Sequence, residues 1–150
     1  MGLMKINPSI SFLSIAVEDM EVSKDFYSNI LGWTPEKESS QFISYKMNGF
    51  YFCIYPVSEM KKDLNPEKVE KNASRTLLSI NLPSPEELNV FFEYLREKKV
   101  KILKSPEIPP WGGLRGYFCD PDEVSWEVVY NPRTKLDSQG NIIFDSPSKE

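Results

Sequence analysis

The chain has 150 residues, of which 40% are hydrophobic and 13% aromatic, and its formal net charge at pH 7 is −4. This length and composition favour one folded globular domain and exclude a disordered chain. The acidic balance argues against nucleic acid as a partner, because phosphate binding needs a basic face.

The sequence contains no histidine. This excludes a histidine general base, the Ser-His and Cys-His nucleophile pairs and histidine metal ligands. No apolar run approaches the roughly 18 residues of a membrane span, and the N-terminal residues lack the pattern of a signal peptide. We therefore expect a cytoplasmic protein with no membrane contact, in which Cys53 and Cys119 are reduced, buried thiols.

The first half of the chain predicts a strand, a helix and a hairpin. Ile10 to Val17 is the first strand, and Asp19 can cap a helix, Met20 to Leu31, that ends at Gly32. Asn48-Gly49 is the strongest hairpin signal in the sequence. The other predicted strands of this half are Trp33 to Ser39, Gln41 to Met47 and Phe50 to Tyr55. A polar connection with one helical turn then occupies residues 57–74.

The second half repeats this order. Arg75 to Leu82 is a strand, and Ser84 opens a capping box for a helix that runs to about Lys98. The later predicted strands are Val100 to Leu103, Leu114 to Cys119 and Ser125 to Tyr130, with a Pro-rich bend at Pro106 to Pro110 and a type I turn at Asp120-Pro121. In the polar tail, residues 133–150, Ile142-Ile143-Phe144 is predicted to dock on the body as an edge strand.

The two halves of the sequence match each other when one is shifted by 65 residues. Phe12 then falls on Leu77, and Phe26 falls on Phe91. We infer a β-α-β-β-β unit that occurs twice in a single domain, residues 1–150, as modules at about 8–56 and 75–132. One sheet with one helix is too little to close a core, whereas two facing sheets can enclose a cleft.

Two motifs resemble those of a known superfamily. DFYSNILGW, after a strand that ends in VEDM, and YFCDPDEVSWEVVYNP near the end are similar to motifs of the vicinal-oxygen-chelate superfamily, which includes glyoxalase I, extradiol dioxygenases and bleomycin-resistance proteins. The resemblance implies an α+β, glyoxalase-like fold of two βαβββ modules, with mixed curved sheets that enclose a central cleft. It also implies a homodimer.

The metal enzymes of that superfamily place four ligands on the first and last strands of the two modules. By motif register these positions are Phe12, Cys53, Leu77 and Glu127. Phenylalanine and leucine cannot coordinate a metal, so Glu127 is the only ligand-type residue retained. We therefore predict no cofactor and no metal site, with a divalent metal as the alternative.

The function predicted from this resemblance is binding of a small organic molecule in the cleft. The candidate ligand-binding residues are Phe12, Phe52, Cys53, Leu77, Trp111, Arg115, Tyr117 and Glu127. For each aromatic residue, packing in the core is the alternative to ligand contact. Trp111 suits either a lid or a loop anchor, and Arg115 suits either an anionic ligand or a surface ion pair.

Whether the chain also catalyses a reaction stays open at this point. Glu127 is the candidate catalytic residue, because a carboxylate that faces an apolar cavity has its pKa raised toward the range of a general base. The reaction would then be of the lyase, isomerase or dioxygenase type. The structural alternative is that Glu127 bonds the backbone or a tyrosine hydroxyl and organises the fold.

Overall fold

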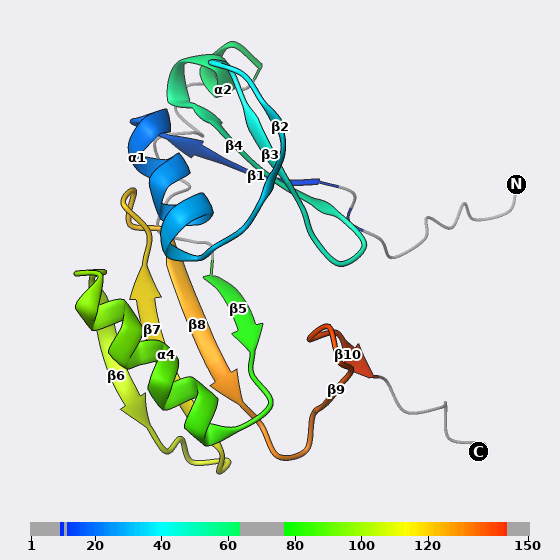
Figure 1. Cartoon of the computed structure of the whole chain (residues 1–150), viewed down its shortest axis with the longest axis vertical. Coiled ribbons are helices and arrows are strands. Elements are labelled where there is room, and N and C mark those ends of the chain that lie inside the picture. The colour runs from blue at the N-terminus through cyan, green and yellow to red at the C-terminus, as the bar shows by residue number, and fades with distance from the viewer. Residues whose placement is uncertain (1–9, 11, 64–76, 144–150) are drawn as a thin grey trace, which may run out of the picture.

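The computed structural model of the chain describes residues 10, 12–63 and 77–143. It contains two four-stranded sheets, with the strand orders β1-β4-β3-β2 and β5-β8-β7-β6 (Figure 1). In each sheet the first strand pairs in parallel with the last, and the other pairs are antiparallel. This confirms the predicted α+β class with mixed sheets. The two sheets do not close into a barrel.

The first sheet and its helices follow the predicted order. The strands are β1 (Phe12–Val17), β2 (Pro35–Glu38), β3 (Ile43–Lys46) and β4 (Tyr51–Pro56). The expected single α-helix is instead a short α-helix, α1 (Met20–Lys24), that continues as a π-helix, η1 (Asp25–Ile30). Asp19 caps α1 by accepting hydrogen bonds from two backbone N–H groups, as predicted.

The second sheet has the same order of elements. The strands are β5 (Leu77–Asn81), β6 (Ile102–Glu107), β7 (Leu114–Cys119) and β8 (Ser125–Tyr130), and the helix is α4 (Pro85–Glu97). The Ser84 side chain accepts a hydrogen bond from the backbone N–H of Glu87, which is half of the predicted capping box. β6 runs beyond its predicted end at Leu103 and includes Pro106. A proline is tolerated there because β6 is an edge strand.

One aromatic core holds the two sheets together. Tyr27 and Phe52 of the first module lie 4.9 Å apart by ring centroids. Trp126 of the second module lies 6.0 Å from Phe52 and 5.8 Å from Trp33. Since these rings come from both halves of the chain and most are buried, neither module has a hydrophobic core of its own.

The turn between β7 and β8 docks on the helix of the first module. Buried Asp120 accepts hydrogen bonds from the Tyr27 hydroxyl and from two backbone N–H groups of its own turn. Asp122 accepts from the Ser23 hydroxyl and from the backbone N–H of Glu18. The Asp-Pro-Asp turn of the sequence therefore joins the two modules as well as two strands.

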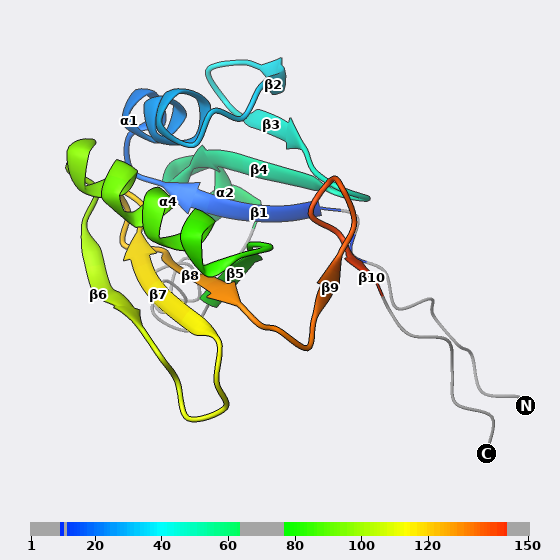
Figure 2. The ribbon, with the colours of Figure 1, turned by 60° about the horizontal axis from the view of Figure 1, so that its bottom comes forward.

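The C-terminal segment corrects one prediction. Ile142–Ile143 (β10) does not extend either main sheet; it pairs with Lys135–Leu136 (β9) in a separate two-stranded hairpin, and Phe144 lies outside the described residues. The hairpin is tied to the first module because the Asn48 side chain donates a hydrogen bond to the Gln139 carbonyl. Figure 2 shows it beside the end of the first sheet.

The connection between the modules is more helical than predicted. Helix α2 (Val57–Asp63) follows β4 directly, and the rest of the predicted connection lies outside the described residues. In the described part of the chain, no helix is long and apolar enough to cross a membrane.

Candidate functional site

The second sheet carries a row of three polar side chains across neighbouring strands. Ser79 on β5 and Tyr117 on β7 are both register partners of Glu127 on β8. The Ser79 hydroxyl donates to Glu127 Oε1 at 2.9 Å, and the Tyr117 hydroxyl donates to Oε2 at 2.7 Å. We call these three residues the Glu127 row. The row fixes the orientation of the carboxylate, because each oxygen has its own donor.

The row lies on the face of the sheet opposite α4. Successive side chains of a strand alternate between faces. Phe118, Trp126 and Val128 alternate with Tyr117 and Glu127 and belong to the buried core. Tyr117 and Glu127 are both partly exposed, so the Glu127 row is open to a molecule that approaches from the side away from the helix.

The hydrogen bond between Tyr117 and Glu127 changes the pKa of the Tyr117 hydroxyl. The bond, followed by burial and by the charge of the carboxylate, raises the pKa of the Tyr117 hydroxyl above its ordinary value of 10.0. Tyr117 is therefore a neutral hydrogen-bond donor at physiological pH. The structural alternative for Glu127, a bond to a tyrosine hydroxyl, is thus present in the structure.

The first sheet carries a matching row. Ser14 on β1 and Ser44 on β3 are the register partners of Cys53 on β4. Ser14 lies 65 residues before Ser79, which is the offset of the internal repeat. Burial raises the pKa of the Cys53 thiol, an effect that a hydrogen bond with Ser14 partly offsets. Cys53 and Cys119 are both free and buried, as predicted.

Of the four residues transferred from the superfamily register, Cys53 and Glu127 belong to the rows, whereas Phe12 and Leu77 lie two residues before Ser14 and Ser79. Phe12 and Leu77 stand at the starts of β1 and β5 and are 60% and 52% exposed. They pair in register with Tyr51 and Ser125, and the Phe12 ring stacks on Tyr51 at a centroid distance of 5.2 Å. Ser14 and Ser79, which contact Cys53 and Glu127 directly, were missed by the sequence analysis. The repeat offset relates these two serines, but it relates Phe12 and Leu77 in the same way and so does not single the serines out.

Phe52 does not belong with the other candidate residues. It is 1% exposed and packs against Tyr27, Trp33 and Trp126 in the core. Phe52 and Cys53 are neighbours on one strand and therefore face opposite sides of the sheet. The structure places Phe52 under the helix, which is the core-packing alternative.

The two remaining candidates lie at the end of β7 nearest the glycine loop. Arg115 shares the face of Tyr117, and its guanidinium carbon lies 6.0 Å from the centroid of the Tyr117 ring. Trp111 is partly buried in the loop, where its backbone carbonyl accepts a hydrogen bond from the Arg133 side chain. Gly113 must be glycine, since its φ is +79° and an added Cβ would clash with the Tyr130 carbonyl oxygen.

The donor set does not fit the divalent site of the superfamily's metal enzymes. In residues 10, 12–63 and 77–143, no three Cys, Asp or Glu side chains are grouped so that they could hold one metal ion. Glu127 has serine and tyrosine hydroxyls as neighbours, and Cys53 has two serines. A catalytic divalent ion commonly needs about three protein ligands, and these rows do not supply them.

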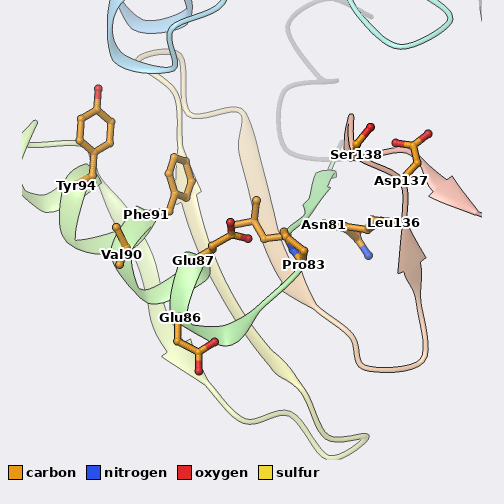
Figure 3. Close-up of a pocket in the computed structure, with 12 residues that line it drawn as sticks. Asn81, Pro83, Glu86, Glu87, Val90, Phe91, Tyr94, Leu136, Asp137 and Ser138 are labelled. Atoms are coloured by element: carbon orange, nitrogen blue, oxygen red, sulfur yellow. The ribbon is translucent and has the colours of Figure 1, made fainter.

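A separate groove lies between α4 and the C-terminal hairpin (Figure 3). Its volume is about 660 Å³, and its apolar side chains include Leu82, Val90, Phe91 and Leu136. None of the eight candidate ligand-binding residues lines this groove. The groove is therefore separate from the Glu127 row.

Most of the chain matches a known protein family. The family model described as Glyoxalase/Bleomycin resistance protein/Dioxygenase superfamily matches residues 9–128. No curated protein matches the chain.

Solved structures resemble the chain over most of its length. A glyoxalase-related enzyme from Fulvimarina pelagi is 28% identical, covers 93% of this chain and 99% of its own, and superposes with a TM-score of 0.82. A glyoxalase/bleomycin resistance protein/dioxygenase from Nocardioides is 25% identical, with coverages of 85% and 86% and a TM-score of 0.73. Lactoylglutathione lyase from Agrobacterium tumefaciens shares the fold at 16% identity, with coverages of 84% and 96% and a TM-score of 0.68.

Proposed function

Because the chain belongs to the glyoxalase/bleomycin resistance protein/dioxygenase superfamily, we propose that it binds a small organic molecule at the Glu127 row. The observation that carries this proposal is the row itself. A carboxylate stands on an accessible sheet face and is held in one orientation by Ser79 and Tyr117. Binding sites use such a small number of positioned polar groups to orient a ligand.

Glu127 can still accept hydrogen bonds from a ligand. Each carboxylate oxygen has about two lone-pair directions, and the described hydrogen bonds use one on each oxygen. A hydroxyl or amine of a ligand would bind to the remaining ones. The exposed side chain of Leu77, at the start of the same sheet, offers apolar contact to the rest of the molecule.

The proposed binding uses no resident metal, because the residues of both rows fit a divalent ion poorly. The ligand is held by hydrogen bonds and by apolar contact. We also propose that the chain is a homodimer, as the superfamily resemblance implies, and that it is cytoplasmic, as its sequence pattern and free cysteines suggest. Sedimentation equilibrium of the purified chain tests the dimer, and a mass of one chain would contradict it.

A second candidate function is a reaction of the lyase or isomerase type with Glu127 as general base. The observation that favours it is the pairing of Glu127 with Tyr117, a neutral donor at physiological pH. Once Glu127 has accepted a proton from a substrate, it no longer needs the Tyr117 proton, and the hydroxyl can instead donate its hydrogen bond to another atom of the substrate. Turnover by the wild-type protein, lost in Glu127→Gln while ligand affinity persists, would favour this function over binding alone.

The test is a thermal-shift screen of metabolites and drug-like molecules. A ligand that binds only the native state raises the melting temperature by mass action. We expect hits for the wild-type protein and the loss of their shifts in Glu127→Gln. The matched control is Glu93→Gln on the exposed side of α4, which should keep every shift. A screen without hits, or hits that survive Glu127→Gln, would contradict the proposal.

A further inference from the structure

Arg115, beside the Glu127 row, has no ion-pair partner among the described residues, and its guanidinium lies over the ring of Tyr117. It precedes Tyr117 by two residues on β7, so the two side chains share one face of the sheet. Its Nε atom is buried and has no hydrogen-bond partner. A buried N–H that is left unpaired costs free energy. Because the Arg115 side chain as a whole is partly exposed, a partner from outside the chain can reach its guanidinium.

The acidic side chains on the neighbouring strands, Glu107 and Glu127, form no ion pair with Arg115 in the described structure. Glu107 on β6 is the register partner of Arg115, but its Oε1 atom binds the Lys104 ammonium at 2.8 Å. Both oxygens of Glu127 accept hydrogen bonds within the row. Arg115 pairs in register with Val129 on its other side, which carries no charge. The surface ion pair that the sequence allowed for Arg115 is therefore not formed in the described structure.

We propose that the ligand of the Glu127 row is a small organic carboxylate that also carries a hydrogen-bond donor. The planar guanidinium of Arg115 would hold the carboxylate, for which its geometry is matched. The donor, a hydroxyl or an amine, would bind Glu127. A monoanion suits this site better than a phosphate dianion, because Glu127 is itself negative and repels the second charge. This inference rests on the proposed binding function and names its ligand class.

The spacing of the two groups sets the shape of the ligand. Arg115 pairs in register with Val129, which is two residues from Glu127 on β8, so Arg115 and Glu127 are diagonal neighbours on adjacent strands, about 7–8 Å apart. The carboxylate and the donor should therefore stand at opposite ends of a compact molecule. In 4-hydroxybenzoate they lie at opposite ends of one ring, whereas in 2-hydroxybenzoate they are adjacent and bond each other.

The experiment measures the affinities of the three isomeric hydroxybenzoates and of their uncharged amides by titration calorimetry. For the wild-type protein we expect the 4-isomer to bind best and its amide to bind at least about tenfold more weakly, since a hydrogen bond to a charged group contributes roughly 1.5–3 kcal/mol. Arg115→Gln should remove the preference for the acid, and Arg115→Lys should restore part of it. The control Arg96→Gln, on the exposed side of α4, should change nothing.

Several outcomes would overturn the inference. Amides that bind as tightly as the acids, or an acid preference that persists in Arg115→Gln, would show that Arg115 does not select a carboxylate. Absence of binding by all six probes would also overturn it. The two proposals can be told apart. If molecules found in the broad screen depend on Glu127 but not on Arg115, binding at the Glu127 row stands and only the carboxylate ligand class is rejected.

Discussion

Tyr27 donates a 2.8 Å hydrogen bond to Asp120 Oδ2, and this buried bond joins the helix of the first module to the β7–β8 turn of the second. The Tyr27 hydroxyl also accepts a hydrogen bond from the Trp126 indole N–H at 3.3 Å. Trp126 and Glu127 are neighbours on β8. The contact between the modules therefore includes β8, the strand that carries Glu127.

Replacement of Tyr27 with phenylalanine should destabilise the protein. The change removes the donor of Asp120 and the acceptor of Trp126 inside the core, and an unsatisfied buried polar group costs about 1–3 kcal/mol. Urea unfolding at neutral pH measures the loss. The control is Tyr94→Phe, which removes one partly buried bond to the Ile30 carbonyl and should cost less. An unfolding free energy equal to that of the wild type would contradict this role of Tyr27.

The stabilisation by Tyr27 should disappear at alkaline pH. Burial and then the charge of Asp120 raise the pKa of Tyr27 above its ordinary value of 10.0. A pKa raised in the folded state gives stability that is fully present below the unfolded pKa, and this stability is lost as the pH rises through the folded pKa. The difference in unfolding free energy between the wild type and Tyr27→Phe should therefore narrow above about pH 10. A difference that stays constant there would refute the assignment.

Gly116 allows α4 to pack closely on β7. An added Cβ would lie 2.5 Å from the Phe92 ring, closer than carbon atoms approach in folded proteins. We expect Gly116→Ala to lower the unfolding free energy by about 1–3 kcal/mol through overpacking. The same change in a Phe92→Leu background should cost less, because the smaller side chain makes room. If the loss of unfolding free energy in the double variant equals the sum of the losses in the two single variants, Gly116 and Phe92 do not compete for the same space.

The bond between Tyr117 and Glu127 should be visible in a titration. Because this bond is the largest cause of the raised pKa of Tyr117, Glu127→Gln should move the Tyr117 pKa down toward 10.0, the ordinary value. NMR of protein labelled at the tyrosine rings resolves the individual hydroxyls, with Tyr117→Phe to identify the signal. A Tyr117 pKa that is unchanged in Glu127→Gln would mean that the hydroxyl has another partner in solution.

The amount of metal that the protein retains tests the conclusion that the side chains around Glu127 do not form a divalent-metal site. After incubation with Zn²⁺, Ni²⁺, Mn²⁺ or Fe²⁺ and removal of the excess, we expect far less than one ion per chain, equally in the wild type and in Glu127→Gln. The reason is that, among the residues that the structure describes, Glu127 has no two further side chains beside it that could complete a catalytic site. If the wild type retained about one ion per chain and Glu127→Gln retained none, the conclusion would be wrong. A metal-dependent reaction would then be favoured over metal-free binding.

Local sequence patterns predicted the fold well. The strands at Leu114–Cys119 and Ser125–Tyr130 have the predicted bounds, because alternation and an Asp-Pro turn define both ends. The π-helix was missed, since its apolar spacing does not differ from that of an α-helix over a few residues. The separate hairpin was also missed, because whether an apolar pair such as Ile142–Ile143 joins a sheet depends on tertiary contacts.

The site was only partly predictable. Glu127 could be predicted from its position in the motif. Ser14 and Ser79 could not, because the superfamily register points to Phe12 and Leu77 instead. Strand pairing decides which residue of β5 meets Glu127, and pairing register is not visible in a single strand. Phe52 lies in the core, which is the alternative that the sequence left open for each aromatic residue, because it faces the opposite side of β4 from Cys53.

The location of a bound ligand tests the central claim most directly. Backbone NMR shifts of the protein should be followed while a hit of the thermal-shift screen is added. We predict that the largest changes occur at Ser79, Arg115, Tyr117 and Glu127, and that they vanish in Glu127→Gln. Changes concentrated instead at Leu82, Val90, Phe91 and Leu136 would place the ligand in the groove between α4 and the hairpin, and would contradict a binding site at the Glu127 row.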